Sequence, residues 1–339
     1  MSSDSPSFDV VGIGNAIVDV LGEVDHDFIR QHDLAKGGMA LIDEPRMEAL
    51  YHAFPPAEEH SGGSAANTMV GVAALGSVAG YIGKVKDDQI GAIFAHDITA
   101  AGVEFGVKPS PDGPPSGRCL IAVTPDAERT MSTFLGASVE LAPDDIDHEM
   151  VAAAEILYLE GYLWDPPSAK AAMRAAVDTA KAAGRRVALS LSDSFCVDRH
   201  RDEFQDLVAH SVDLLFANED EAMALYECAT HDEALLILEG ACEVSAITRG
   251  SRGCTVLGDN GAIEVPAHQV EKKIDTTGAG DLFAAGFLHA FAGGAEPELA
   301  AQVGSIAAAE VITHMGARPA TDLRTLVEES LGATAADLL

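Results

Sequence analysis

The sequence predicts an α/β fold in which helices cover both faces of a doubly wound, mostly parallel sheet that also carries a small β lid. Apolar runs of strand length alternate with segments of helical periodicity along most of the chain, which is typical of βαβ units. Apolar residues make up 47% of the 339 residues, enough for a large core. Two regions, at about 18–42 and 104–138, interrupt the alternation and are the expected lid. We therefore expect a single domain over residues 1–339.

The first half of the chain predicts two buried strands and two helices beside glycine-rich turns. An apolar run that ends in glycines is typical of a buried strand, and we expect strands at residues 8–13 and 78–82. Apolar residues at helical spacing predict helices at residues 65–75, ended by Gly76, and at residues 90–101. Each of these strands precedes one of these helices, as a parallel sheet requires.

The second half of the chain continues the same alternation. The expected strands are residues 155–159, 187–191, 214–217 and 245–248, and the expected helices are residues 168–183 and 219–226. Because strands alternate with helices of this length, the crossover connections place helices on both faces of the sheet. Residues 118–135 instead predict a hairpin with its turn at 124–127, which fits the lid.

The charge and the cysteine content exclude several classes of protein. Asp and Glu outnumber Lys and Arg by 54 to 21, which gives a net charge of −33. Nucleic acid and anionic membranes repel such a chain, so we expect a small-molecule substrate and neither of those partners. The five cysteines are widely spaced without a CxxC pair, and the N-terminus lacks the pattern of a signal peptide. We expect a cytoplasmic protein without a disulfide framework or a zinc site.

The motif that carries most chemistry is DTTGAGD, which precedes a long apolar helix. Gly278, Ala279 and Gly280 can present backbone N–H groups at the start of that helix, where the helix dipole favours an anion. Asp281 beside this cradle can accept the proton of a hydroxyl that attacks a phosphoryl group. A tight loop with an ordinary first-turn aspartate is the alternative for a bare GxGD, and the full motif is much more specific.

Two further glycine-containing motifs predict a site for a ligand with several hydroxyls. In GGSAAN, small residues let the backbone approach a ligand, and Asn67 offers both a donor and an acceptor, although a plain helix start is the alternative. In GIGNAIVD, the third glycine of a dinucleotide motif would fall at Ile17, which disfavours NAD binding. What remains is a strand end that presents Asn15 and Asp19, and a carboxylate can bind two adjacent hydroxyls.

Two motifs at strand ends predict contacts with a nucleotide and its metal ion. Acidic side chains in NEDE, at residues 218–221, can hold Mg²⁺ through its water shell, and a solvated first helical turn is the alternative. The glycines of TRGSRG, at residues 248–253, suit a turn that contacts a nucleotide, and a simple β-turn is the alternative. The sequence has no GxxxxGK[ST] motif, so any ATP site belongs to another type.

These motifs, in this order and spacing, resemble the ribokinase-like (PfkB) family of carbohydrate and nucleoside kinases over essentially the whole chain. The resemblance rests on GIGNAIVD, GGSAAN, GKVKDDQIG, NxxE, TRGSRG and DTTGAGD. It implies a doubly wound α/β domain with a small β lid over the sugar site, ATP as the phosphoryl donor, and Mg²⁺. It also implies a monovalent cation such as K⁺ beside the anion cradle, near Asp275, Thr277 and Gly316.

Within that family the chain is most similar to the adenosine kinase branch. By this resemblance Asp19 and Asn67 hold ribose hydroxyls, and Arg129 acts in catalysis near the transferred phosphate. The substrate-binding residues that it implies are Asn15, Asp19, Gly62, Gly63, Ser64, Asn67, Met131, Thr133, Leu135 and Phe195, of which the last four line an apolar base pocket. The nucleotide-binding residues are Asn218, Thr248, Gly250, Gly253 and His314, with Glu221 toward Mg²⁺.

The expected function is transfer of the γ-phosphoryl group of ATP to a primary hydroxyl, with adenosine converted to AMP. The lid and residues 162–164 differ from animal adenosine kinases, so a kinase for ribose, fructose or a related sugar is the alternative. A nucleoside-binding sensor without turnover is the alternative of another class, and the intact GAGD argues against it. We expect a monomer, or a homodimer that pairs through the lid.

Overall fold

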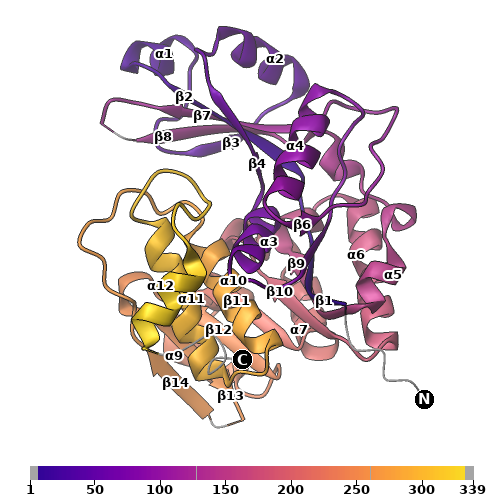
Figure 1. Ribbon diagram of the computed structural model, residues 1–339, viewed down its shortest axis with the longest axis vertical. Helices are drawn as coiled ribbons and strands as arrows, with labels where there is room; N and C mark the ends of the chain where they lie inside the picture. The colour runs from indigo at the N-terminus through magenta and orange to yellow at the C-terminus, as the bar shows by residue number, and fades with distance from the viewer. Residues whose placement is uncertain (1–6, 127, 260, 333–339) are drawn as a thin grey trace.

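The computed structural model describes residues 7–126, 128–259 and 261–332, which form two sheets and the helices around them (Figure 1). A large sheet carries most of the helices, and a small sheet lies across one end of it. None of the helices in these ranges combines the length and apolarity that a membrane-spanning helix needs. All five cysteines are free thiols in the structure, and three of them, Cys119, Cys196 and Cys254, are buried.

The large sheet has nine strands in the order β14-β13-β12-β11-β10-β9-β1-β5-β6. The strands are β1 (Phe8–Ile13), β5 (Ala79–Ile82), β6 (Val103–Glu104), β9 (Ala154–Glu160), β10 (Arg186–Ser190), β11 (Leu214–Asn218), β12 (Val244–Thr248), β13 (Cys254–Gly258) and β14 (Gly261–Val265). All neighbours are parallel from β6 to β12, and β13 and β14 add two antiparallel pairings at the edge. This order confirms the predicted, mostly parallel sheet.

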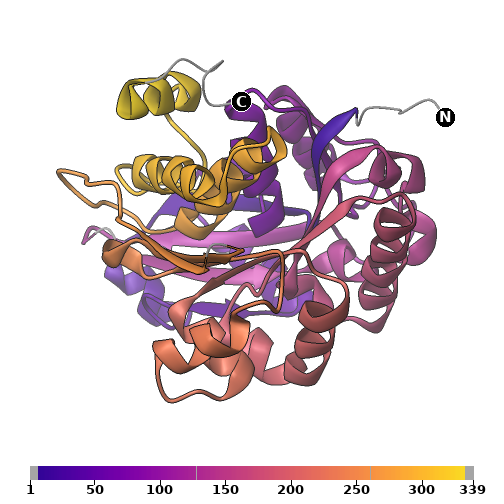
Figure 2. The same ribbon diagram turned by 90° about the horizontal axis from the view of Figure 1, so that it is seen from below.

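Helices cover both faces of the large sheet, which confirms the doubly wound class (Figure 2). One face carries α3 (Ser64–Ala74), α4 (Gln89–Ala100), α10 (Ala279–Ala292), α11 (Pro297–Val311) and α12 (Leu323–Leu331). The other carries α5 (His148–Ala152), α6 (Pro167–Ala182), α7 (Ser194–His210), α8 (Glu219–Tyr226) and α9 (His231–Leu238). Successive residues of β1 serve the two cores, since Val10 packs into the first and Val11 into the second.

The small sheet has five strands in the order β3-β8-β7-β2-β4. They are β2 (Ile17–Glu23), β3 (Met39–Leu41), β4 (Glu58–Gly62), β7 (Gly117–Val123) and β8 (Arg129–Phe134), with α1 (His26–Gln31) and α2 (Glu44–Ala53) between them in the chain. Helix α2 packs against β7 and β8. Short 3-10 turns complete the structure at η1 (Gly136–Glu140), η2 (Pro143–Asp145), η3 (Gly161–Trp164) and η4 (Gly250–Arg252).

The small sheet differs in part from the lid that the sequence predicts. The hairpin at 118–135 forms as β7 and β8, but its expected turn includes Ala127, which lies outside the described residues. Strand β4 and helix α2 fall outside both expected lid ranges, and Glu104 belongs to β6 of the large sheet. The sequence does not predict β4, because this edge strand reads EEHSG and has no apolar alternation.

Candidate active site

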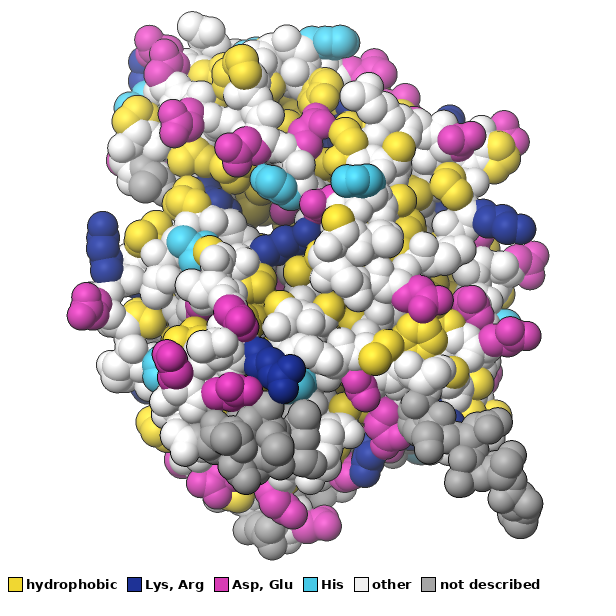
Figure 3. All heavy atoms as spheres, in the orientation of Figure 1, with side chains coloured by type: hydrophobic (Ala, Val, Ile, Leu, Met, Phe, Trp, Pro, Cys, Tyr) yellow, Lys and Arg dark blue, Asp and Glu magenta, His cyan; other side chains and the backbone are white. Residues whose placement is uncertain are grey.

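A cavity of about 900 Å³ lies between the two sheets. Its walls are the carboxyl ends of β1, β9, β10, β11 and β12, the first turns of α3 and α10, and the inner face of the small sheet. Ligands of open α/β sheets bind at this edge, because the loops that follow the parallel strands converge there. On the face of the molecule shown in Figure 3, acidic side chains are more numerous than basic ones, in keeping with the net charge of −33.

The first turn of α10 is one wall of this cavity. Gly278 precedes the helix with φ +79°, and a Cβ added there would lie 2.7 Å from the Cα of Ala317, so only glycine fits. The Ala279 N–H donates to the carbonyl of Thr276 at 3.2 Å, and no side chain caps the helix. Gly280 and Asp281 follow in the first turn, where N–H groups and the helix dipole favour an anion.

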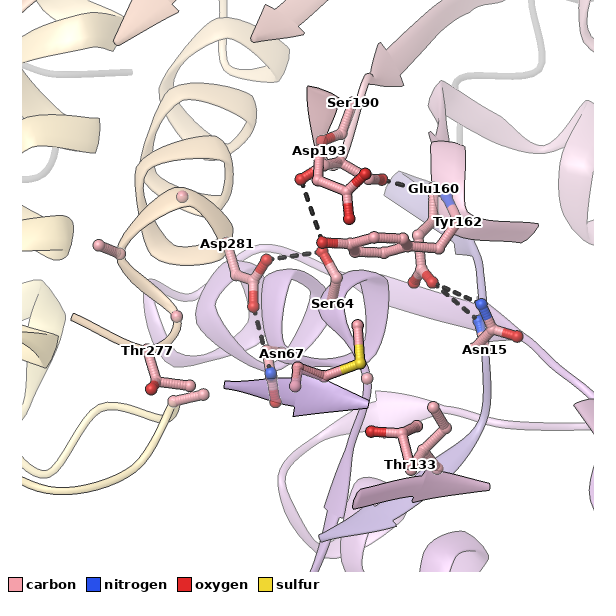
Figure 4. A pocket seen from close by; sticks show the side chains of 18 of the residues that line it. Asn15, Ser64, Asn67, Thr133, Glu160, Tyr162, Ser190, Asp193, Thr277 and Asp281 are labelled. Atoms are coloured by element: carbon pink, nitrogen blue, oxygen red, sulfur yellow. Dashed lines mark hydrogen bonds between the residues drawn. The ribbon is translucent and has the colours of Figure 1, made fainter. Parts of the chain in front are cut away.

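Asp281 points into the cavity and accepts hydrogen bonds from two side chains of α3 (Figure 4). The Ser64 hydroxyl donates to Oδ1 at 2.6 Å, and Nδ2 of Asn67 donates to Oδ2 at 3.2 Å. Burial raises the pKa of Asp281 to about 6, although these two hydrogen bonds lower it. A carboxylate with this pKa can accept a proton near neutral pH.

Ser64 and Asn67 reach Asp281 because the chain turns sharply before α3. Gly63 has φ +97°, and a Cβ added there would lie 2.2 Å from the backbone oxygen of Asn15. Gly62 lies directly under the Asp19 carboxylate, since a Cβ at Gly62 would be 2.4 Å from Oδ2. The GGS motif thus brings β2, β4 and the start of α3 together, and contacts within the protein already require its two glycines. The close approach of its backbone to a ligand stays a prediction.

The buried carboxylate of Glu160, which no sequence motif indicates, supports the start of α3 and the segment after β1. Glu160, at the end of β9, accepts from the Asn15 side chain at 2.8 Å and from the Ala65 N–H at 2.8 Å. The Asn15 oxygen in turn accepts from the Ser138 hydroxyl at 3.0 Å. Burial raises the pKa of Glu160 to about 7, opposed by these hydrogen bonds. Both polar side-chain atoms of Asn15 therefore form hydrogen bonds within the protein, to Glu160 and Ser138, and hold these segments of the cavity wall together.

Asp19 lies on β2 and lines the cavity from the side of the small sheet. Burial raises its pKa to about 6, while the positive charges of Arg318 and Arg129 lower it. Asp281 lies near enough to raise the Asp19 pKa through charge repulsion. The two carboxylates thus face one cavity from its two sides.

An apolar surface continues from Asp19 along the inner face of the small sheet. It includes three of the residues predicted to form a base pocket, Met131, Thr133 and Leu135, together with Met39, Leu41, Cys119 and Ile121. The fourth, Phe195, lines the same cavity from α7. Phe195, at the start of α7, is 73% exposed, and Met39 and Leu41 on β3 are 50% and 59% exposed. Large apolar side chains that are exposed around a cavity are typical of a surface that a ligand covers.

Asp275 and Arg129 form an ion pair next to the anion cradle. Nη1 of Arg129 lies 2.9 Å from Oδ2 of Asp275, and both side chains are less than 10% exposed. Thr277 donates its N–H and its hydroxyl to Oδ1 of Asp275, and the Gly316 N–H donates to Oδ2 at 3.1 Å. Nε and Nη2 of Arg129 are buried and have no partner among the described residues. Thus Asp275, Thr277 and Gly316 come together as predicted, but with Arg129 as the cation beside them.

The predicted nucleotide-binding residues divide into two groups. Asn218, Thr248 and Glu221 line the cavity on the side opposite the small sheet. Glu221 caps α8, because its oxygens accept from the Asn218 N–H at 2.9 Å and from Nδ2 of Asn218 at 2.6 Å. Burial raises the pKa of Glu221 to about 7. Glu221 thus lies in the first turn of α8, but it is buried and not solvated as the alternative expects.

The remaining predicted nucleotide contacts lie outside the cavity lining that the described residues form. Gly250 and Gly253 flank the turn η4 with positive φ, and a Cβ at Gly253 would lie 2.0 Å from the oxygen of Val265. The fold itself thus requires that glycine. His314 is half-buried, 3.3 Å from Glu310 and 3.1 Å from the carbonyl of Met315. Within the described ranges no group of three or more His, Cys, Asp or Glu side chains has the arrangement of a metal site.

Reasoning from the sequence misses several residues of the cavity lining, among them Glu160 and Tyr162, and it also misses Arg318, which lies outside that lining. Glu160 ends a mostly apolar strand and precedes a glycine, and a carboxylate at such a strand end could have indicated a site residue. Tyr162 lines the cavity and donates its hydroxyl to the carbonyl of Ser192 at 3.2 Å, and Ser192 has φ +72°. Arg318 bonds Asp97 and carries no local sequence signal.

The fold and the site define a class of protein. A doubly wound α/β domain holds a cavity under a small sheet, and a carboxylate at a helix N-terminus there can take a proton beside a bound anion. A model of the pfkB family of carbohydrate kinases matches residues 46–324, and the chain belongs to this family. It is thus a carbohydrate or nucleoside kinase, a phosphotransferase with a hydroxyl acceptor.

Solved structures and curated proteins include relatives of several specificities. The chain is 48% identical to adenosine kinase from Sinorhizobium meliloti, with a TM-score of 0.88 over 95% of this chain and 99% of that one. It is 44% identical to a probable sugar kinase from Rhizobium etli, with a TM-score of 0.89 over 98% and 100%. It is 32% identical to an ATP-dependent ribose-1-phosphate kinase from Halopiger xanaduensis over 77% of this chain and 83% of that protein.

Proposed function

We propose that the protein is a nucleoside kinase that transfers the γ-phosphoryl group of ATP to the 5′-hydroxyl of adenosine. One observation carries this proposal: a single cavity combines Asp281 at the start of α10, Asp19 on the opposite sheet, and an apolar surface beside Asp19. A phosphoryl group with its attacking hydroxyl, the ribose hydroxyls and a flat base need these three surfaces in this order. The 48% identity to an adenosine kinase supports the same acceptor.

In the proposed reaction Asp281 accepts the proton of the 5′-hydroxyl as its oxygen bonds to the γ-phosphorus. The bond from that phosphorus to the β,γ-bridging oxygen breaks, and ADP leaves with the electron pair. N–H groups in the first turn of α10 stabilise the negative charge on the transferring group. Ser64 and Asn67 hold the Asp281 carboxylate in place through their hydrogen bonds. Asp19 accepts hydrogen bonds from the ribose hydroxyls.

Magnesium fits the nucleotide side of the cavity. A hard cation prefers oxygen ligands and keeps much of its water shell, and the Glu221 carboxylate lines this side. Bound with ATP, Mg²⁺ would neutralise negative charge on the phosphates. A monovalent cation near Asp275 stays a prediction, because Arg129 already pairs with that carboxylate, and no step of the mechanism uses such a cation.

The apolar surface favours an uncharged acceptor over a sugar phosphate. Ile121, Met131 and Leu135 are apolar, and of the described residues that line the cavity the one cationic side chain is Arg199. Arg199 pairs with Asp165 at 2.8 Å, so it is already neutralised. An anionic phosphate placed against this surface would lose its hydration without gaining a free cation. A nucleoside base instead gains from covering apolar area.

Replacement of the proposed base tests this mechanism. Asp281→Asn preserves the side-chain shape but cannot accept the proton, so kcat should fall by about 10²–10⁴ while the KM for adenosine changes little. Asp206→Asn, an exposed carboxylate on α7, is the matched control and should keep wild-type turnover. The assay measures AMP and ADP formation from Mg-ATP and adenosine. An Asp281→Asn enzyme with near-normal kcat would remove Asp281 from the mechanism.

A further inference from the structure

Three consecutive residues in the segment after α11 contact three different parts of the site. The Gly316 N–H donates to Asp275 beside the anion cradle at 3.1 Å. Ala317 packs against Gly278 at the start of α10 and lines the cavity. Arg318 extends in the other direction, to α4 and β4 beneath the acceptor side. Residues 316–318 thus join the phosphoryl side of the cavity to the acceptor side.

The Arg318 guanidinium is held by hydrogen bonds to Asp97 and Ser61, which are also hydrogen-bonded to each other. Nη1 donates to Oδ2 of Asp97 at 2.8 Å, and Nη2 donates to the Ser61 hydroxyl. The same Asp97 oxygen accepts from the Ser61 N–H at 2.7 Å and from its hydroxyl at 2.6 Å. The Arg318 side chain is 20% exposed, and its Nε is buried without a partner among the described residues. This network ties the end of β4 to α4.

The end of β4 supports Asp19, the carboxylate that is proposed to bind the acceptor. Strand β4 pairs with β2 so that Ser61 is opposite Val18 and His60 is opposite Asp19. The next residue, Gly62, lies directly under the Asp19 carboxylate. A shift of β4 would therefore move Asp19, and the Arg318 network prevents this shift.

The segment that carries Arg318 is itself held in place. Glu310, a buried residue near the end of α11, accepts from the N–H groups of Ala320 and Thr321 at 2.9 and 3.0 Å. The Thr321 hydroxyl donates to the same oxygen at 3.0 Å. These bonds close the loop just after Arg318, so the guanidinium is preorganised toward the acceptor side.

We propose that Arg318 is a positioning residue of the acceptor site: it anchors β4 and holds the Asp19 carboxylate where it accepts hydrogen bonds from the acceptor hydroxyls. The proposal rests on the proposed function, because it assumes that Asp19 binds the acceptor. The charge of Arg318 supports the same role, because burial raises the pKa of the Asp19 carboxylate and the positive charge of Arg318 lowers it.

Several charged or titratable groups face Asp19 from the elements packed against it. They are Arg318 after α11, Arg129 on β8, Asp281 on α10, His60 on β4, and the Cys119 thiol on β7, whose pKa burial raises to about 12. The two arginines and His60 lower the Asp19 pKa, and Asp281 raises it. Of the groups that lower the Asp19 pKa, Arg318 has the largest effect, so its removal moves this pKa upward.

The test compares Arg318→Gln and Arg318→Lys with wild type, and uses Arg324→Gln on exposed α12 as a control of equal charge change. Arg318→Gln should raise the KM of the acceptor by about tenfold or more, equivalent to about 1.4 kcal/mol. Its KM for ATP should change less than about twofold. The acid limb of kcat/KM should move to higher pH, since Asp19 binds a proton more readily. Arg318→Lys keeps the positive charge, so its acid limb of kcat/KM should lie at the wild-type pH.

Two outcomes overturn the role of Arg318 and leave the proposed function standing. One is an Arg318→Gln enzyme, folded by its melting curve, with the acceptor KM and acid limb of wild type. The other is an equal rise in the KM for ATP and acceptor, which indicates a general loss of structure. Each variant KM is compared with that of wild type for the acceptor that wild type prefers. If that acceptor is a sugar, the proposed function is overturned, but the role of Arg318 can still be tested. A wild-type chain that turns over no acceptor would overturn both.

Discussion

The Asp281 carboxylate already has two donors before any substrate arrives. Ser64 occupies one oxygen and Asn67 the other. The acceptor hydroxyl must therefore share or replace one of these bonds, and the short bond from Ser64 also stabilises the ionised carboxylate. Ser64 thus influences the pH at which Asp281 can act as a base.

Removal of the Ser64 hydroxyl should shift the pH profile in a defined direction. The pKa of Asp281 is raised to about 6, so the proton-accepting form predominates above pH 6 and is lost as the pH falls below it. Ser64→Ala removes a hydrogen bond that lowers this pKa, so the acid limb of kcat should move to higher pH, by up to about one unit. Steady-state rates at saturating substrate from pH 5 to 8 measure the shift. A limb at the wild-type position would contradict the account.

At the residue scale, the sequence predicts those site residues whose role depends on local context. Asp281 stands in a helix N-terminus motif and Asp19 in the GIGNAIVD motif, so these motifs indicate their chemistry, although the structure places Asp19 within β2 and not at a strand end. Glu160 and Arg318 act through contacts with residues 95 and 257 positions away in the chain. No local pattern encodes such contacts, which is why these two residues emerge only from the folded chain.

At the element scale, the start of α10 depends on one glycine. Gly278→Ala forces a side chain into a left-handed conformation and against the backbone of Ala317, so it should cost about 1–3 kcal/mol of unfolding free energy. It should also lower kcat, because the first-turn N–H groups shift. Gly280→Ala is the matched control for stability, since a Cβ there meets no atom within 4 Å. Denaturant unfolding and turnover measure the effects. Equal stability of wild type and Gly278→Ala would contradict this view of the turn.

The predictability of the elements follows their burial. Buried strands such as β1 and β9 are mostly apolar, and helices such as α6 have clear periodicity, so their sequences specify them within a residue or two. Strand β4 is polar at an edge, and its existence depends on pairing with β2. The expected lid is incomplete for this reason, although its central hairpin forms as expected.

At the scale of the whole molecule, the two sheets carry complementary parts of the chemistry. In the proposed mechanism, the large sheet and its helices supply the base and the anion cradle, and the small sheet supplies Asp19 and the apolar surface. We expect the exposed side chains of Met39, Leu41 and Phe195 to become covered when the acceptor binds. Closure of the small sheet over the cavity would also exclude water, which otherwise competes as the phosphoryl acceptor.

The central claim is that the acceptor is a nucleoside, and a substrate panel tests it most directly. ADP release from Mg-ATP would be measured with adenosine, inosine, guanosine, cytidine, ribose, fructose and ribose 1-phosphate under identical conditions. The account predicts the highest kcat/KM for adenosine, by at least about tenfold over the sugars, because a base covers the apolar surface beside Asp19. A higher kcat/KM for a sugar or for ribose 1-phosphate, or no ADP release with any of them, would contradict it.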